Sequence, residues 1–511
     1  MFSTIRNSTN LMRVALVLAR HDALFLLELF GLAPSVVSIV RLIAGRKAGG
    51  RPGERLAQAL TEAGPSFIKM GQAFATRSDL LGEEMCEDLS KLQDRLPPFP
   101  TDQARDTIER ELGQTLEKLF FTFDDTPIAA ASIAQVHFAV TESGRKVAVK
   151  VLRPHIEQAF QRDINLLYWI AELVENLRPE LRRLKPVQVI KKLAETVEME
   201  MDLRFEAAAA DEMRENFRGD PDFFIPEIDW SRTSQRVMVT ERLDGFPLDD
   251  RDALSNAGLI PSEVLTKAAN ATFLQVFRDG FFHADVHPGN LFVMPDGAIG
   301  VVDFGIMGRI DVKTRRYLAE MLLAFLTRNY RRAAEVHFEA GWVPPHRSVE
   351  IFTQACRSIA EPILDKPQNE ISIAQLLGQL FKITETFEME TQPQLLLLQK
   401  TLLVAEGTAR KLDPEANMWM LARPLIEGWM RANLGPEARV KNAVEGAAET
   451  LSRLPRIMDT IEESAAIISS GEIRLRSKRV VSHKNLGENT NRIMSWICIA
   501  LLGSIVLLTF S

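Results

Sequence analysis

The sequence predicts a two-lobed α+β fold that follows a helical N-terminal extension and precedes a C-terminal transmembrane helix. Apolar residues recur at spacings of three and four through residues 1–125, which is typical of amphipathic helices. The pattern then changes to short β-like runs at 135–140, 146–152 and 236–241, and long helical stretches separate them. We therefore expect a small β-rich lobe followed by a larger helical lobe.

The composition is that of an ordinary globular protein with a small acidic excess. The 511 residues include 61 basic and 68 acidic side chains, which gives a net charge of −7. No long basic tract is present, so nucleic acid is not expected as a partner, because phosphate binding needs clustered Lys and Arg. Cys86, Cys356 and Cys498 lie far apart, which excludes a disulfide framework and a zinc site and indicates a reducing compartment.

The end of the sequence contains a candidate membrane anchor. Residues 493–510 carry no charged side chain, and a helix of this length spans about 27 Å, enough to cross a hydrocarbon core. The alternative is a buried core helix, which would normally show a polar stripe. Basic residues before the run predict that the preceding domain faces the cytoplasm. They are Arg474, Arg476, Lys478, Arg479, Lys484 and Arg492.

The periodicity also predicts the main divisions of the chain. Long helices are expected at 156–177 and 186–216, and two strands at 291–294 and 299–302. We expect a helical extension, a small lobe, a large lobe, a helical and basic linker, and a membrane anchor. Their boundaries are 1–125, 126–245, 246–440, 441–492 and 493–511, respectively.

A segment before the strand at 146–152 matches the spacing of a phosphate-binding loop. Protein kinases cover the ATP phosphates with G-x-G-x-x-G-x-V and place a lysine in a following V-A-I-K strand. Here Ala129, Ala131 and Ala134 occupy the glycine positions. Alanine does not adopt a positive φ cheaply, so we expect a stiffer loop; the alternative is a helix N-terminus. The residues expected to bind ATP are Ile128, Ala129, Ala130, Ala131, Ser132, Ile133, Ala134, Gln135, Val136 and Lys150.

Two further motifs match the catalytic segments of protein kinases. Residues 283–290 read HADVHPGN and fit H-x-D-x-x-x-x-N, and Asp303 begins a D-F-G motif. In this chemistry one carboxylate accepts the proton of the attacking hydroxyl, and an amide and a second carboxylate hold Mg²⁺. We therefore assign Asp285 as the base, and Asn290 and Asp303 as metal ligands. Since the motifs occur in the kinase order, the sequence predicts a protein-kinase-like fold with ATP and Mg²⁺ as cofactors.

A kinase fold also needs a helix carboxylate that orients the strand lysine. We expect Glu206 to pair with Lys150 and count it among the ATP-binding residues. The alternative is a solvated acidic helix face, because Glu195, Glu198 and Glu200 lie nearby.

One motif that protein kinases use to bind peptides is missing. No A-P-E follows Gly305, and the chain passes within a few residues into a predicted helix at 313–326. This difference favours a small-molecule or lipid-like substrate, or ATP hydrolysis.

Together these motifs resemble the UbiB family of atypical kinase-like proteins over about residues 56–414. The alanine-rich loop in place of glycines is a signature of that family. Two other family motifs, Lys-x-Gly-Gln and Glu-x-Asp, are also present. Their residues, to which the resemblance assigns an autoinhibitory role, are Lys69, Gly71, Gln72, Glu200 and Asp202.

The resemblance implies a kinase fold from which peptides are excluded. The helix that carries Lys69 would cover the peptide site, with Lys69 facing Glu200 and Asp202. The implied activity is ATP hydrolysis or unorthodox phosphoryl transfer that supports ubiquinone biosynthesis at the bacterial inner membrane. The implied partners are ubiquinone precursors or other lipid-like small molecules, the membrane, and the ubiquinone biosynthetic enzymes. Bacterial members commonly end in two hydrophobic segments, whereas this sequence shows one.

Two alternatives to a membrane-anchored, Mg-ATP-dependent enzyme stay open. A regulatory protein kinase is disfavoured by the missing A-P-E and by the helix that carries Lys69. A nucleotide-sensing scaffold for the biosynthetic enzymes is disfavoured by the presence of Asp285, because a scaffold has no need of a proton acceptor.

Overall fold

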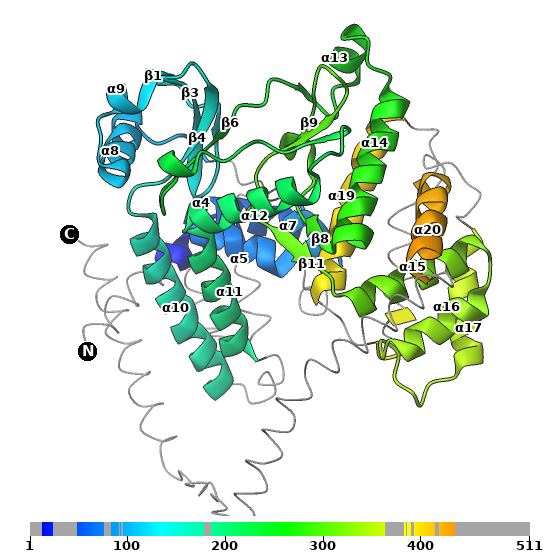
Figure 1. Cartoon of the computed structure of the whole chain (residues 1–511). Coiled ribbons are helices and arrows are strands. Elements are labelled where there is room, and N and C mark those ends of the chain that lie inside the picture. Colours follow the sequence, from blue (N-terminus) through cyan, green and yellow to red (C-terminus); the bar gives the residue numbers. More distant parts are fainter. Residues whose placement is uncertain are drawn as a thin grey trace, which may run out of the picture. The chain divides into compact units, whose positions relative to one another are not determined.

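The computed structural model in Figure 1 describes most of the chain before residue 435. The described residues are 13–23, 49–75, 83–90, 92, 96–177, 185–362, 383–384, 386–389, 393–413 and 418–434. The chain divides into two compact units, Met1–Ala432 and Asn433–Ser511, and the fold below is that of the first unit. The predicted transmembrane helix lies outside the described residues, and within them no helix combines the length and apolarity needed to cross a bilayer.

One antiparallel sheet forms the small lobe. Its strands β1 (Phe120–Phe123), β3 (Ala134–Thr141), β4 (Lys146–Leu152) and β6 (Val237–Glu241) follow one another in the order β1-β3-β4-β6. A fifth strand, β2 (Ala129–Ala130), pairs with β3. The bounds of β4 are those predicted from the sequence.

Helix α8 (Thr101–Leu112) lies beside this sheet (Figure 1). Val147 and Val149 of β4 are fully buried and pack in one apolar cluster with Ile108 of α8. Because side chains alternate along a strand, Lys150 belongs to the opposite face of the sheet. The valines thus place the lysine on the side away from α8.

The prediction that residues 1–125 are entirely helical is wrong at β1. The short helix α9 (Leu116–Leu119) leads directly into β1, where Phe120 pairs with Thr141 of β3. Phe120 is buried in the apolar cluster under the sheet. Tertiary pairing with β3 therefore determines the conformation here, and the local spacing of apolar residues does not show it.

The predicted continuous helix at 186–216 is two helices. α11 (Pro186–Glu200) follows α10 (Ile156–Leu177), and α12 (Leu203–Asn216) begins after a break at Asp202. Asp202 has extended backbone angles (φ −123°, ψ 95°), and its side chain accepts a hydrogen bond from the Arg204 backbone N–H. This N-cap starts a new helix, since an aspartate in that position satisfies an otherwise unpaired amide.

Three N-terminal helices pack together beneath the small lobe. They are α4 (Pro52–Ala63), α5 (Pro65–Ala75) and α7 (Glu83–Ser90), and α5 also contacts α10 and α11. Ser66 of α5 donates a 2.8 Å hydrogen bond to the buried carboxylate of Asp163 on α10. The helix that carries the Lys-x-Gly-Gln motif is thus joined to the kinase-like lobe by a buried polar contact.

The large lobe is mainly helical, with short strands next to the catalytic motifs. β8 (Phe281–His283) pairs with β11 (Met307–Arg309), and β5 (Phe223–Phe224), β10 (Ile299–Val301), β9 (Leu291–Val293) and β7 (Phe246–Pro247) form a second sheet in that order. The helices of this lobe are α13 (Arg251–Asn256), α14 (Pro261–Phe273), a π-helical segment at Leu274–Asp279, α15 (Val312–Leu326), α16 (Tyr330–Glu339), α17 (Val349–Ala360), α19 (Pro393–Leu412) and α20 (Met418–Leu434).

Two arginines of the large lobe hold α12 of the small lobe. Arg309 of β11 donates 2.8 and 2.5 Å hydrogen bonds to the two carboxylate oxygens of Glu212. Arg278 donates to the Asp220 carboxylate (2.6 Å) and to the Asn216 carbonyl at the end of α12 (2.8 Å). The C-terminal half of α12 is therefore attached to the large lobe.

Candidate active site

Three charged side chains meet between the lobes. Lys150 Nζ of β4 lies 2.6 and 2.9 Å from the two carboxylate oxygens of Glu206 on α12. It also lies 3.2 Å from Asp303 Oδ1, on the segment after β10. The structure thus brings together the predicted lysine, the helix carboxylate and the D-F-G carboxylate, in the arrangement that positions ATP phosphates in kinases.

These charges shift one another's ionisation. The charge of Lys150, opposed by partial desolvation, lowers the pKa of Asp303 to about 2. Burial raises the pKa of Glu206 despite the adjacent ammonium group. Burial alone would lower the pKa of Lys150, but Asp303 and Glu206 together raise it. Asp303 is therefore a carboxylate and Lys150 an ammonium at neutral pH.

The buried ring of His283 joins the two catalytic segments. Its Nε2 donates to the Asp303 carbonyl (2.8 Å), and its Nδ1 accepts from the Asp285 backbone N–H (3.2 Å). Burial lowers the pKa of this imidazole, which is consistent with a neutral ring that donates from one nitrogen and accepts at the other. His283 thus fixes the backbone of the predicted base relative to that of the predicted metal ligand. The sequence assigned it no role, although it is the first residue of H-x-D-x-x-x-x-N.

Asn290 is fixed in the same loop. Its Nδ2 donates to the Asp285 carbonyl (3.1 Å), and its own carbonyl accepts from the Val302 N–H (3.0 Å). The amide nitrogen is thus engaged, and Oδ1 is the atom that a metal would take. The side chain is buried.

The donor set suits magnesium. Asp303 has a left-handed backbone conformation (φ 61°), rare for a residue other than glycine and typical of functional positions. An amide oxygen from Asn290 and a carboxylate from Asp303 are hard ligands of the kind Mg²⁺ prefers, with water and phosphate oxygens completing its shell. Among the described residues no group of three His, Cys, Asp or Glu side chains forms a separate metal cluster.

The alanine-rich segment is a strand, a turn and a strand, so the alternative of a helix N-terminus is wrong. Ala129 pairs with Val136 and Ala130 with Gln135. At the tip, the Ala131 N–H donates a 2.7 Å hydrogen bond to the Ala134 carbonyl. This is the backbone shape that the kinase-like spacing predicted.

Arg153, which the sequence analysis did not single out, holds the tip of this loop. Its Nε and Nη2 donate to the Ala131 carbonyl (3.0 and 2.8 Å), and its backbone N–H donates to the Ile133 carbonyl (2.8 Å). The Ser132 hydroxyl between them is buried and has no hydrogen-bond partner among the described residues. The guanidinium of Arg153, three residues after Lys150, therefore stiffens the loop.

The side chain of Gln135 points into the small lobe and forms hydrogen bonds there. Its Oε1 accepts from the Phe99 N–H (3.0 Å), and its Nε2 lies 2.8 Å from Nε2 of His137. The side chain is buried in the interior of the small lobe. These hydrogen bonds occupy the side-chain amide of Gln135. The predicted contact of Gln135 with ATP would therefore have to come from its backbone.

The Lys-x-Gly-Gln helix contacts the small lobe through Lys69, whose Nζ lies 3.1 Å from Glu200 Oε2 of α11. Both side chains are largely buried. Asp202 instead binds Arg204 through its backbone N–H (3.1 Å) and guanidinium (2.9 and 2.6 Å). Of the two facing carboxylates implied by the resemblance, Glu200 therefore pairs with Lys69, and Asp202 caps α12.

The remaining two motif residues secure the packing of α5. Gln72 Nε2 donates to the Leu92 carbonyl (3.4 Å). A Cβ atom at Gly71 would lie 2.5 Å from Leu92 Cδ1 and 2.7 Å from Leu60 Cδ1. Glycine thus lets α5 approach these leucines closely.

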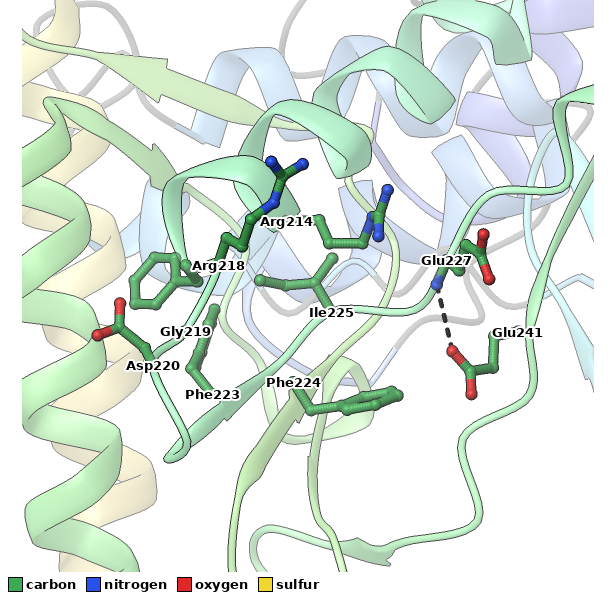
Figure 2. A pocket seen from close by; sticks show the side chains of 10 residues that line it. Arg214, Arg218, Gly219, Asp220, Phe223, Phe224, Ile225, Glu227 and Glu241 are labelled. Carbon is green, nitrogen blue, oxygen red and sulfur yellow. Dashed lines mark hydrogen bonds between the residues drawn. The ribbon is translucent and has the colours of Figure 1, made fainter.

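A separate cavity of about 340 Å³ lies at the other end of α12 from Glu206 (Figure 2). Phe217, Phe223 and Ile225 are buried, and Arg214 and Arg218 lie at the α12 end, whereas Glu227 and Glu241 come from the opposite side. Gly219, Asp220 and Phe224 complete its lining. None of the predicted site residues borders it.

Comparisons with known proteins assign the fold to a known class. The ABC1 atypical kinase-like domain matches residues 91–337, and the UbiB helical domain matches residues 356–417. A solved structure of a Mycobacterium tuberculosis protein in complex with erythromycin superposes with a TM-score of 0.53 at 25% identity, over 77% of this chain and 98% of that one. The fold is that of an atypical kinase-like protein, which confirms the predicted α+β kinase-like fold.

Similar curated proteins narrow the class to one family. A protein of Marinobacter nauticus named "Probable protein kinase UbiB" is 42% identical over 481 residues, which cover 92% of this chain and 88% of the relative. A protein of the same name from Aeromonas hydrophila is 43% identical over 83% of this chain and 78% of the relative. The chain belongs to the UbiB family.

Proposed function

We propose that this protein is a membrane-anchored, Mg-ATP-dependent atypical kinase or ATPase that supports ubiquinone biosynthesis. The observation that carries the enzymatic part is the contact of Lys150 with both Glu206 and Asp303. This triad is the phosphate- and metal-positioning arrangement of kinases. The proposed role in ubiquinone biosynthesis rests on membership of the UbiB family.

Each residue of the site has a distinct task in this proposal. Lys150, oriented by Glu206, binds the ATP phosphates, and the backbone of the alanine loop covers them. Asn290 and Asp303 hold Mg²⁺, which when bound neutralises charge on the phosphates. Asp285 accepts the proton of the attacking hydroxyl or water while that oxygen bonds to the γ-phosphorus and the bond to the leaving ADP oxygen breaks.

The position of α5 favours water or a lipid-like hydroxyl as the acceptor. The Lys69 contact with Glu200 and the Ser66 contact with Asp163 attach this helix to the small lobe at two points. Such attachment supports a peptide-excluding site, and the missing A-P-E motif supports it too. We place the catalytic lobes on the cytoplasmic side of the bacterial inner membrane, anchored by the single apolar run at 493–510.

The decisive experiment measures ubiquinone in cells that lack the gene and re-express either the wild type or Asp285→Asn. Restoration by the wild type alone supports an enzyme of this pathway. Restoration by both proteins would identify a scaffold. A ubiquinone content that changes neither on loss of the gene nor on re-expression would remove the pathway from the proposal.

Two further measurements separate the remaining parts of the proposal. Labelled phosphate that appears on a protein only with intact Asp285 would support a regulatory protein kinase instead. Deletion of residues 493–511 should move the protein into the soluble fraction, and retention in the membrane would contradict the proposed anchor.

A further inference from the structure

The side chain of His287, to which the sequence assigned no role, lies beside the predicted base Asp285. Its Nε2 atom lies 3.8 Å from Asp285 Oδ2. This separation is too long for a direct hydrogen bond. The half-exposed imidazole edge and the carboxylate therefore face one space in which a third atom can bind.

The hydrogen-bonding of the ring sets which nitrogen carries the proton. His287 Nδ1 accepts a 3.0 Å hydrogen bond from the Gly289 backbone N–H. A neutral imidazole has one acceptor and one donor nitrogen, so the proton is on Nε2 when Nδ1 accepts. The donor of the ring is thus the nitrogen nearer to Asp285.

The turn that follows holds the ring in place. The Asn290 N–H donates a 2.9 Å hydrogen bond to the His287 carbonyl, which closes the short turn at Pro288–Asn290. A Cβ atom at Gly289 would lie 2.8 Å from His287 Cε1 and 3.0 Å from Nδ1. Glycine at this position therefore leaves room for the imidazole against the backbone.

We infer that His287 is a second catalytic residue, whose Nε2–H holds the attacking hydroxyl or water against Asp285; this inference rests on the proposed function. One oxygen atom accepts a hydrogen bond from Nε2–H and donates its own proton to Asp285 Oδ2. As that oxygen bonds to the γ-phosphorus, its proton passes to Asp285, and the electron pair of the breaking bond leaves with ADP. His287 neither gains nor loses a proton in this step.

A purely structural role for His287 makes a different prediction, because its Nδ1 already caps the turn. Asparagine can accept from the Gly289 N–H in the same way and is a good N-cap residue, but its side chain is too short to place a donor at Nε2. Glutamine can place an amide N–H near the Nε2 position and is a poor cap. The two substitutions therefore separate the cap from the donor.

The test measures ATP hydrolysis in magnesium buffer by the full-length protein and by the variants His287→Asn, His287→Gln and Asp285→Asn. We expect His287→Asn to lower kcat by about tenfold or more, with the KM for ATP changed by less than about twofold, because the lost contact positions the nucleophile and not the nucleotide. We expect His287→Gln to keep a several-fold higher kcat than His287→Asn.

Each other outcome has a defined meaning. Full kcat in His287→Asn overturns the inference, and so does equal loss in both histidine variants. Equal turnover by the wild type and Asp285→Asn overturns the proposed function and the inference with it. If a histidine variant fails to fold, Gly289→Ala replaces it, since the added methyl displaces the ring while keeping the imidazole; an unchanged kcat would then overturn the inference.

Discussion

Lys150 Nζ and Asp303 Oδ1 lie 3.2 Å apart although 153 positions separate them in the chain. One belongs to the small-lobe sheet and the other follows a strand of the large lobe. Their contact joins the small lobe to the large lobe at the predicted phosphate site. Because this contact exists only in the folded protein, the pKa of Asp303 is lower in the folded than in the unfolded state.

A pH titration of stability should reveal this contact. The pKa of Asp303 is lowered to about 2 from an ordinary value of 3.8, so its carboxylate stabilises the folded protein fully above about pH 4 to 5 and loses that contribution as the pH falls towards 2. We expect the free energy of unfolding to fall more steeply between about pH 4 and 2 in the wild type than in Asp303→Asn. Urea denaturation at a series of pH values measures both slopes, and parallel curves would contradict the assignment.

The Arg153 contact predicts how the alanine loop is controlled. Arg153→Met removes two charge-assisted hydrogen bonds to the Ala131 carbonyl. We expect faster hydrogen exchange at amides 131–133 and an ATP affinity lower by about tenfold, since hydrogen bonds from charged groups contribute about 1.5 kcal/mol or more.

A matched control for this variant is Arg105→Met. The guanidinium of Arg105 also lies in the small lobe, but it pairs with Asp125 at 2.7 Å and not with the carbonyls of the alanine loop. Equal loss of ATP affinity in the two variants would show that a general effect on the lobe, and not the loop, is responsible.

The ion pair of Lys69 and Glu200 should stabilise the folded protein by more than an ordinary surface ion pair does. In a double-mutant cycle with Lys69→Met and Glu200→Gln we expect a coupling energy of about 1 to 3 kcal/mol, because both side chains are largely buried. The exposed pair of Arg145 and Glu227, also 3.1 Å apart, serves as the control. There we expect less than about 1 kcal/mol, and equal coupling in the two cycles would refute the prediction.

Gly308 in β11 should tolerate no side chain. A Cβ atom there would overlap the ring of Phe282, which is fully buried one residue before His283. We expect Gly308→Ala to cost about 1 to 3 kcal/mol of stability through overpacking, and Phe282→Leu to restore part of it.

Gly428 in α20 is the control for this substitution. A Cβ atom at Gly428 meets nothing within 4 Å. Gly428→Ala should therefore raise the free energy of unfolding by about 0.5 to 1 kcal/mol, through helix propensity. Thermal or chemical denaturation of both variants gives the comparison, and destabilisation by both would point away from the Phe282 contact.

The sequence could predict the parts of the site that depend on local patterns. The bounds of β4 follow from alternating valines, and the spacing from Asp285 to Asn290 is fixed by one short turn. The pairing of Lys150 with Glu206 required in addition that α12 approach the sheet, which only the kinase-like order of motifs implied.

Other features could not be predicted, because they depend on contacts between distant segments. The break at Asp202 interrupts a helical pattern whose periodicity runs through it. Arg153 gains its role from two backbone carbonyls of a preceding loop, and backbone groups leave no residue-specific pattern. His283 and His287 lie within a recognised motif, but the role of each depends on which ring nitrogen forms a hydrogen bond with which neighbouring group.

The contacts of Arg278 and Arg309 with α12 cross the boundary between the two lobes. They attach the C-terminal half of α12, the helix that carries Glu206, to the large lobe, although in sequence this helix lies between strands of the small lobe. We expect nucleotide exchange by the proposed enzyme to involve a rotation of the β-sheet relative to the C-terminal half of α12. We expect the distances from Lys150 to Glu206 and to Asp303 to lengthen together, and a probe pair across either would report opening directly.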